Sequence, residues 1–108
     1  MTRNQEIICQ TAEAYGYGTR VFGRIITITD GTWTIQVGDA PLEDLCTQVH
    51  HAVMSSPMDF QARHRWLAFA RSCFSAEAKE RELAWRREGE KRLRERELSE
   101  EENGNGFL

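Results

Sequence analysis

The sequence predicts an α+β fold: an N-terminal helix, a two-stranded antiparallel β-hairpin and two further helices, the last long and highly charged. Three observations support this prediction. The 108 residues begin with a helical capping pattern, β-branched runs flank Asp30-Gly31, and Arg, Lys and Glu alternate densely in the last third of the chain. We expect a compact α+β domain over residues 1–75, a charged helical extension over 76–99 and a disordered acidic tail over 100–108.

The first helix is predicted from Thr2 and Gln5, whose spacing matches a capping box. Apolar side chains then recur at helical spacing on one side; they are Ile8, Ala12 and Tyr15. Gly16 permits the left-handed backbone conformation that ends many helices. We therefore expect a short helix that stops near Gly16.

The hairpin is predicted from two strand-like runs, residues 19–29 and residues 32–37, on either side of Asp30-Gly31. Asp-Gly suits the positive backbone angles of a two-residue type I′ turn. This turn would pair Ile28 with Trp33 and Ile26 with Ile35. The same apolar face would include Phe22 and Val37, and the polar face would carry Thr27, Thr34 and Gln36. Helices would cover the apolar face.

Two more helices follow the hairpin. Asp39 and Pro41 suit the start of the second helix, whose apolar stripe contains Leu42, Leu45, Cys46, Val49 and Val53. Asp59 suits the start of the third, whose wide apolar arc contains Phe60, Trp66, Leu67, Phe69, Ala70, Cys73 and Phe74. The sequence leaves open whether the third helix runs unbroken past Ser75.

Composition limits the classes of function. A net charge of -3 and an isoelectric point near 5.6 argue against a general binder of polyanions. Three cysteines without a C-x-x-C spacing indicate reduced thiols in a cytoplasmic protein rather than a disulfide framework. No hydrophobic run has membrane-spanning length, so we expect no membrane association. A compact domain of only about 75 residues is marginal alone, which favours a homodimer or a larger partner.

Cys46 and His50 stand four residues apart, at the spacing of metal ligands on one helix face. A zinc site would need two more ligands, and no second paired spacing supplies them. We interpret Cys46 as a core residue with His50 at its polar margin, and expect no metal or cofactor. No orienting carboxylate or oxyanion hole marks a cysteine nucleophile, so we expect a protein that is not an enzyme.

A basic and aromatic stretch, containing Arg63, Arg65, Trp66 and Arg71, occurs where the chain has no acidic residue between Asp59 and Glu77. Guanidinium groups can bind phosphates, and an indole ring can stack on bases. The same residues could equally pair with carboxylates of the second helix or with an acidic protein partner. The stretch is therefore a candidate partner-binding site of open specificity.

Trp85, with Leu83 and Arg86, is a second candidate partner-binding site. A tryptophan among charged residues is either an exposed anchor for a partner or a cap on the small core. Tryptophan and arginine are enriched among the residues that contribute most to protein interfaces. No apolar heptad persists through this segment, which argues against a coiled coil.

These features favour a small non-enzymatic protein-binding module that occupies a surface of a larger protein or complex. In size and acidic balance it is of the style of phage or mobile-element inhibitors of a larger host complex, anti-CRISPR proteins among them, although no motif carries that likeness. The alternative is a nucleic-acid-binding regulator that uses the basic and aromatic helix. Binding to phosphates should weaken steeply with salt, which distinguishes the two functions.

Overall fold

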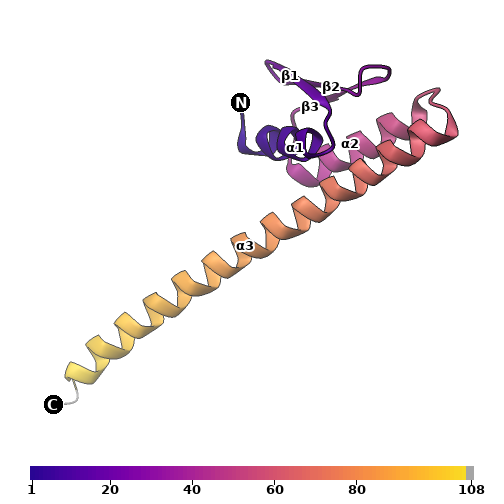
Figure 1. Cartoon of the computed structure of the whole chain (residues 1–108). Coiled ribbons are helices and arrows are strands. Elements are labelled where there is room, and N and C mark those ends of the chain that lie inside the picture. The colour runs from indigo at the N-terminus through magenta and orange to yellow at the C-terminus, as the bar shows by residue number, and fades with distance from the viewer. Residues whose placement is uncertain (107–108) are drawn as a thin grey trace. The chain divides into compact units, whose positions relative to one another are not determined.

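The computed structural model describes residues 1–106, with side chains described for residues 1–98. Its elements are α1 (Arg3–Ala14), β1 (Gly18–Phe22), β2 (Ile25–Thr29), β3 (Thr34–Gly38), α2 (Leu42–Ser55) and α3 (Phe60–Gly106) (Figure 1). The predicted α+β class is confirmed. The chain divides into two compact units, Met1–Glu77 and Ala78–Leu108, and α3 contributes to both.

The prediction of a two-stranded hairpin is wrong, because the sheet has three antiparallel strands in the order β1-β2-β3. The run over residues 19–29 is not one strand. It turns at Gly23, whose φ of 61° is accessible to glycine at little cost, and Phe22 pairs with Ile25 across that turn. A run of this length is about twice an average strand, and a glycine inside it indicates a bend.

The second hairpin is also displaced from the predicted register. Its loop has four residues rather than two, because Thr29 pairs with Thr34. Asp30 closes the loop by accepting hydrogen bonds from the backbone N–H groups of Thr32 at 2.8 Å and Trp33 at 2.6 Å. The resulting pairs are Ile26 with Val37 and Ile28 with Ile35. A shift of two residues leaves the side chains of β2 and β3 on their predicted faces.

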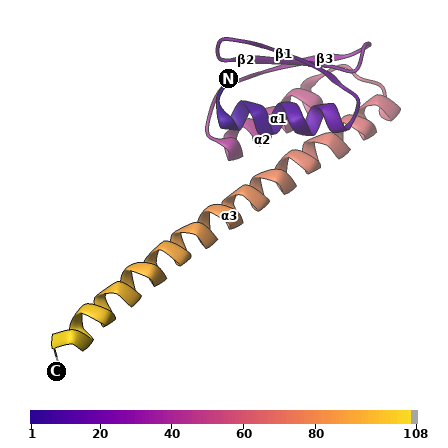
Figure 2. The same ribbon diagram turned by 60° about the vertical axis from the view of Figure 1, so that its left-hand side comes forward.

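One face of the sheet contributes to the core. The buried side chains on that face are Ile26, Ile28, Ile35 and Val37. Figure 2 shows α1 and α2 on one side of the sheet, and they cover this face. The register places Thr27, Thr34 and Gln36 on the other face, as predicted. Phe22 is a correction: it is 86% exposed, since the turn at Gly23 places it opposite Ile25 and away from the core.

The boundaries of α1 follow local sequence signals. Thr2 and Gln5 form the predicted capping box. At the other end Gly16 has a φ of 77°, and the Tyr17 N–H donates to the Ala12 carbonyl at 3.1 Å. This is a Schellman ending, which turns the chain directly into β1.

α2 is joined to the sheet edge by a side chain. The Gln48 amide accepts from the Gly38 N–H at 2.8 Å and donates to the Gly38 carbonyl at 3.1 Å. β3 is an edge strand, so no neighbouring strand pairs with these backbone groups of Gly38, and the Gln48 side chain satisfies them instead. The predicted helix cap at Asp39 is wrong: Pro41 is the N-cap, and Asp39 instead accepts a hydrogen bond from Thr2.

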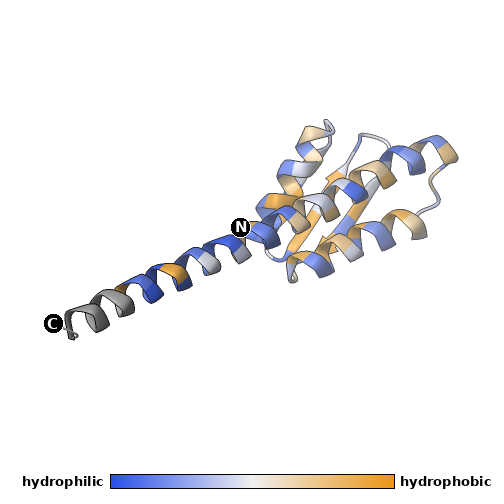
Figure 3. Ribbon diagram, turned by 90° about the horizontal axis from the view of Figure 1, so that it is seen from below, coloured by the Kyte–Doolittle hydropathy of each residue, from blue (hydrophilic) through white to orange (hydrophobic). Residues whose placement is uncertain are grey.

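α3 begins after Asp59, whose carboxylate accepts from the Ala62 N–H at 2.7 Å, and it continues without a break past Ser75. Its buried stripe consists of Ala62, Trp66, Phe69, Ala70 and Cys73. Phe60 and Phe74 were predicted in the apolar arc but are exposed. In Figure 3 the coloured residues of the second unit are mostly hydrophilic, with isolated hydrophobic positions. The predicted disordered tail lies outside the residues whose side chains are described, and it stays a prediction.

Candidate functional site

The basic stretch of α3 does not present all of its predicted residues to solvent. Arg71 is exposed, and Arg63 is half-buried because its guanidinium donates to the Ser56 carbonyl at 2.9 Å. Arg65 is exposed and makes no hydrogen bond or ion pair within residues 1–98. Arg65 and Arg71 are therefore the two members of this stretch that a partner could reach directly.

Trp66 must be removed from the predicted binding surface, because it has no exposed area. Its indole N–H donates to the Asp30 carboxylate at 2.9 Å, and its ring stacks on Tyr17 with centroids 4.5 Å apart. Phe69 meets both rings edge to face, at 5.9 Å and 5.4 Å. Trp66 is thus a core residue that joins α3 to the β2–β3 loop.

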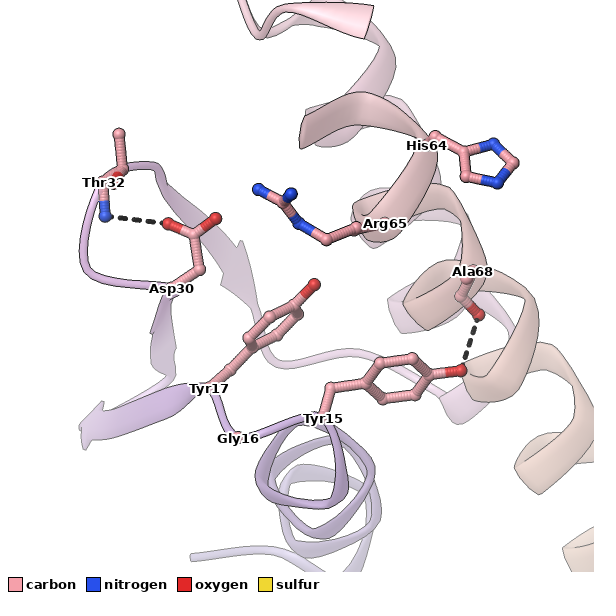
Figure 4. Close-up of a pocket in the computed structure, with 8 residues that line it drawn as sticks. All are labelled: Tyr15, Gly16, Tyr17, Asp30, Thr32, His64, Arg65 and Ala68. Atoms are coloured by element: carbon pink, nitrogen blue, oxygen red, sulfur yellow. Dashed lines mark hydrogen bonds between the residues drawn. The ribbon is translucent and has the colours of Figure 1, made fainter. Parts of the chain in front are cut away.

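Tyr17 and Asp30, which contact Trp66, also line an open cleft of about 460 Å³ (Figure 4). Its lining residues come from three places in the chain, the end of α1, the β2–β3 loop and α3: Tyr15, Gly16, Tyr17, Asp30, Thr32, His64, Arg65 and Ala68. In Figure 4 the Arg65 guanidinium points between Asp30 and the Tyr17 hydroxyl, whereas His64 points away from them. The volume falls within the range of small ligand pockets.

Hydrogen bonding and burial determine the protonation states of Asp30 and Tyr17 in this cleft. Burial alone raises the pKa of Asp30, but the Trp33 and Thr32 backbone N–H groups, the Trp66 indole and the Arg65 charge outweigh it. The net result is a lowered pKa and a carboxylate that stays ionised. Burial, with the Asp30 charge, raises the pKa of Tyr17 and keeps its phenol neutral.

Several polar groups of the cleft are engaged in hydrogen bonds. The Tyr15 hydroxyl is engaged with the Ala68 carbonyl at 3.2 Å and with the Ser72 hydroxyl at 2.5 Å. The Asp30 oxygens hold three donors that fix the loop and the indole. No nucleophile stands beside a base among the lining residues. What this arrangement can do is present the exposed Arg65 beside aromatic rings.

The second predicted segment lies in the second unit. Trp85 is 77% exposed, and Leu83 is half-buried. Arg86 is exposed and forms an ion pair with Glu82 at 2.6 Å, one turn earlier on the helix. Such an exposed pair contributes little to stability, so Arg86 can exchange Glu82 for a partner's carboxylate at low cost.

The cysteines are core residues. Cys9, Cys46 and Cys73 are free thiols and all are buried. Burial, with a smaller effect of Glu77, raises the pKa of Cys46 to about 11, and burial also raises the pKa of Cys73. Among the described residues no group of three or more His, Cys, Asp or Glu side chains could hold a metal ion.

Sequence reasoning missed the parts that Asp30 and Tyr17 play. Asp30 was interpreted only as a turn residue, and Tyr17 only as part of a helix stop. A signal existed for Asp30, because an aspartate in a turn can accept hydrogen bonds from the backbone N–H groups two and three residues later, as in an Asx turn. Nothing local indicated that Trp66, 36 residues later, would donate to the same carboxylate.

Comparison of the chain with models of protein families, with curated proteins and with solved structures finds no match in any of the three. Within the part of the chain that the structure describes, no helix combines the length and the apolar character needed to cross a membrane.

Proposed function

We propose that this protein is a small non-enzymatic binding module that attaches to a larger protein or complex through Trp85. The observation that carries the proposal is the 77% exposure of this ring, since the residues one turn away on the helix, Arg81, Glu82, Glu88 and Gly89, are charged or lack a side chain. More specifically, we propose that this binding inhibits the larger complex, as compact acidic inhibitors of phages and mobile elements do.

The energetics favour Trp85 as an anchor. A tryptophan side chain buries about 200 Å² when fully covered. Covering the exposed part would add about 4 kcal/mol at 25 cal/mol per Å² of apolar surface. Arg86, the next residue, would add a charge, whereas Leu83 stands two positions before Trp85 and faces another side of the helix. Tryptophan and arginine together are typical of the few interface residues that dominate affinity.

The alternative function, nucleic-acid binding through the basic helix, is less favoured. It required Trp66 as a stacking surface, and Trp66 has no exposed area. Arg65 and Arg71 can still attract phosphates, and Phe60 is an exposed ring on the same helix, but the ring predicted to stack on bases is not accessible. The same arginines suit the carboxylates of an acidic protein partner equally well.

The test is affinity capture with the full chain, followed by measurement on the purified partner. Trp85→Ala should weaken the dissociation constant about 30-fold, equivalent to about 2 kcal/mol. Phe60→Ala is the matched control, because Phe60 is 85% exposed on the same helix, and it should change the affinity less than twofold. Equal losses from both variants, or undiminished binding by Trp85→Ala, would contradict the proposal.

Salt dependence provides the second readout. An interface anchored by an aromatic ring should lose little affinity between low and moderate salt, whereas one that depends on phosphate contacts should lose affinity steeply. A captured partner that is released by nuclease treatment would support the alternative function instead.

A further inference from the structure

The uncovered face of the sheet has a composition that the fold does not explain. The register brings nine positions together on this face: Gly18, Arg20, Phe22, Ile25, Thr27, Thr29, Thr34, Gln36 and Gly38. Their neighbours in the strands point into the core. Figure 2 shows the helices of the first unit on the opposite side of the sheet only. This face is therefore available to a ligand.

Phe22 is the first unusual residue on this face. It is 86% exposed, and its cross-strand neighbour Ile25 is 44% exposed. An exposed phenylalanine is unusual here, because solvent-facing strand positions are suited to polar residues, and three of the positions on this face are threonines. A ring held at the end of a paired strand next to a two-residue turn has a fixed backbone and an open π-face. This is the requirement for stacking on a planar group.

The charge on this face is the second unusual feature. Arg20 shares the face with Phe22, and Arg24 stands in the turn that follows it. Neither arginine side chain makes a hydrogen bond or an ion pair among residues 1–98. None of the nine face positions is acidic, although the whole chain carries a net charge of -3. The local excess is thus two positive charges beside one exposed ring.

A hollow of about 400 Å³ lies beside these residues. It is lined by Gly18, Thr19, Arg20, Thr27, Thr29 and Thr34. The Thr34 hydroxyl donates to the Thr29 hydroxyl at 3.1 Å, and the Gln36 amide donates to the Thr27 hydroxyl at 3.4 Å. The lining therefore combines hydroxyl groups with the methyl groups of its threonines, and Arg20 adds a positive charge.

We propose that the uncovered sheet face binds single-stranded nucleic acid. Phe22 would stack on one base, Arg20 and Arg24 would bind the flanking phosphates, and the threonine and glutamine groups would hydrogen-bond to sugars and base edges. Five-residue strands span about 16 Å, enough for two or three nucleotides. A duplex is excluded, because its stacked bases have no free face for the ring. This site shares no residue with the surface around Trp85.

The test is fluorescence anisotropy of a labelled uridine oligonucleotide of about 12 bases with the full chain. We expect a dissociation constant of about 1–100 μM, as for sequence-independent binding. Phe22→Leu, which keeps an apolar side chain and removes the π-face, should weaken binding at least fivefold. Phe60→Leu is the matched control and should have no effect. A matched duplex should bind at least tenfold more weakly than the single strand.

Salt dependence tests the two arginines. Two phosphate contacts predict a slope of about −1.4 for log K against log salt, since each contact to a single strand contributes about −0.7. Arg20→Gln should reduce the slope to about −0.7, whereas Arg71→Gln on α3 should leave it unchanged.

Several results would overturn the proposal. They are the absence of binding at about 100 μM and low salt, equal effects of Phe22→Leu and Phe60→Leu, or a slope that responds to Arg71→Gln and not to Arg20→Gln. A sheet face that instead docks a protein would give Phe22→Leu a defect in partner capture with no change in anisotropy, which also contradicts the proposal. Circular dichroism of each variant separates these outcomes from misfolding.

Discussion

Replacing Asp30 by alanine should destabilise the first unit by about 3 kcal/mol. The carboxylate accepts hydrogen bonds from Thr32 and Trp33 backbone N–H groups and from the Trp66 indole. The two backbone groups lie in an accessible loop and can bind water instead. The indole cannot, because Trp66 has no exposed area. An orphaned buried donor costs about 1–3 kcal/mol, and loss of the loop bonds to a charged acceptor adds about 1–2 kcal/mol.

This is a large change for a small domain. A unit that spans Met1–Glu77 has a total stability of roughly 4–12 kcal/mol. A loss of about 3 kcal/mol lowers the melting temperature of such a domain by roughly 12–24 °C. Urea unfolding followed by tryptophan fluorescence measures the free energy directly, and an unchanged m-value would show that only stability has changed.

Asp39→Ala is the matched control. Asp39 is also a loop aspartate, but its side chain accepts only a 3.3 Å hydrogen bond from the exposed Thr2 hydroxyl. Its removal should cost less than about 0.5 kcal/mol. A double-mutant cycle isolates the indole bond: in a Trp66→Phe background, Asp30→Ala should cost about 1–2 kcal/mol less than in the parent. Full additivity would refute the link between Asp30 and Trp66.

The pH dependence has a defined sign. The folded-state pKa of Asp30 is lowered, so the unfolded chain binds more protons in the acidic range. The stabilisation by the carboxylate is therefore complete above the ordinary value of 3.8 and is lost as the pH falls through the lower folded-state pKa. Asp30→Asn should remove this part of the acid sensitivity. A parent and variant with parallel stability curves between pH 5 and about pH 2 would contradict the reasoning.

Three further predictions concern other parts of the chain. Gly31→Val should cost about 1–3 kcal/mol, because Gly31 has a φ of 96° that a β-branched residue tolerates poorly; a melting temperature within a degree or two of the parent would refute this. A chain ending at Glu77 should keep its melting temperature within a few degrees while losing partner binding, since it retains every residue of the core cluster and loses Trp85; scanning calorimetry and partner affinity check both parts. Cys46 and Cys73 should react with a thiol reagent at neutral pH only when the protein unfolds, because burial raises both pKa values and blocks access; rapid labelling of the native protein would contradict the burial.

Much of the local structure could be predicted from short-range patterns. The capping box at Thr2, the helix stop at Gly16 and the apolar stripe of α2 depend on residues within a few positions of one another, and the structure confirms them. The alternation that places Ile26 and Ile28 on the core face also survived the change in register, because a shift of two residues preserves the pleat.

The errors arose where distant groups compete for one residue. Asp30 could close a two-residue turn or hold a four-residue loop, and the second arrangement also satisfies the buried indole of Trp66. Phe22 was assigned to the core because the predicted strand continued through Gly23. The turn at Gly23 instead pairs Phe22 with Ile25, which places its side chain on the face away from the core. The candidate site changed accordingly: Trp66 moved into the core, and Phe22 became an exposed ring on the uncovered sheet face.

The sequence by itself determined both ends of α1, the apolar stripe of α2 and the alternation of core and solvent positions in β2 and β3. Those properties come from hydrogen bonds and side-chain spacings within one or two turns of the chain. Only the tertiary structure decided which of several exposed or apolar aromatics is buried. That choice depends on packing between segments far apart in sequence: Trp66 is buried because Tyr17 stacks on its ring and Asp30 accepts its N–H, and no local pattern around Trp66 contains either group.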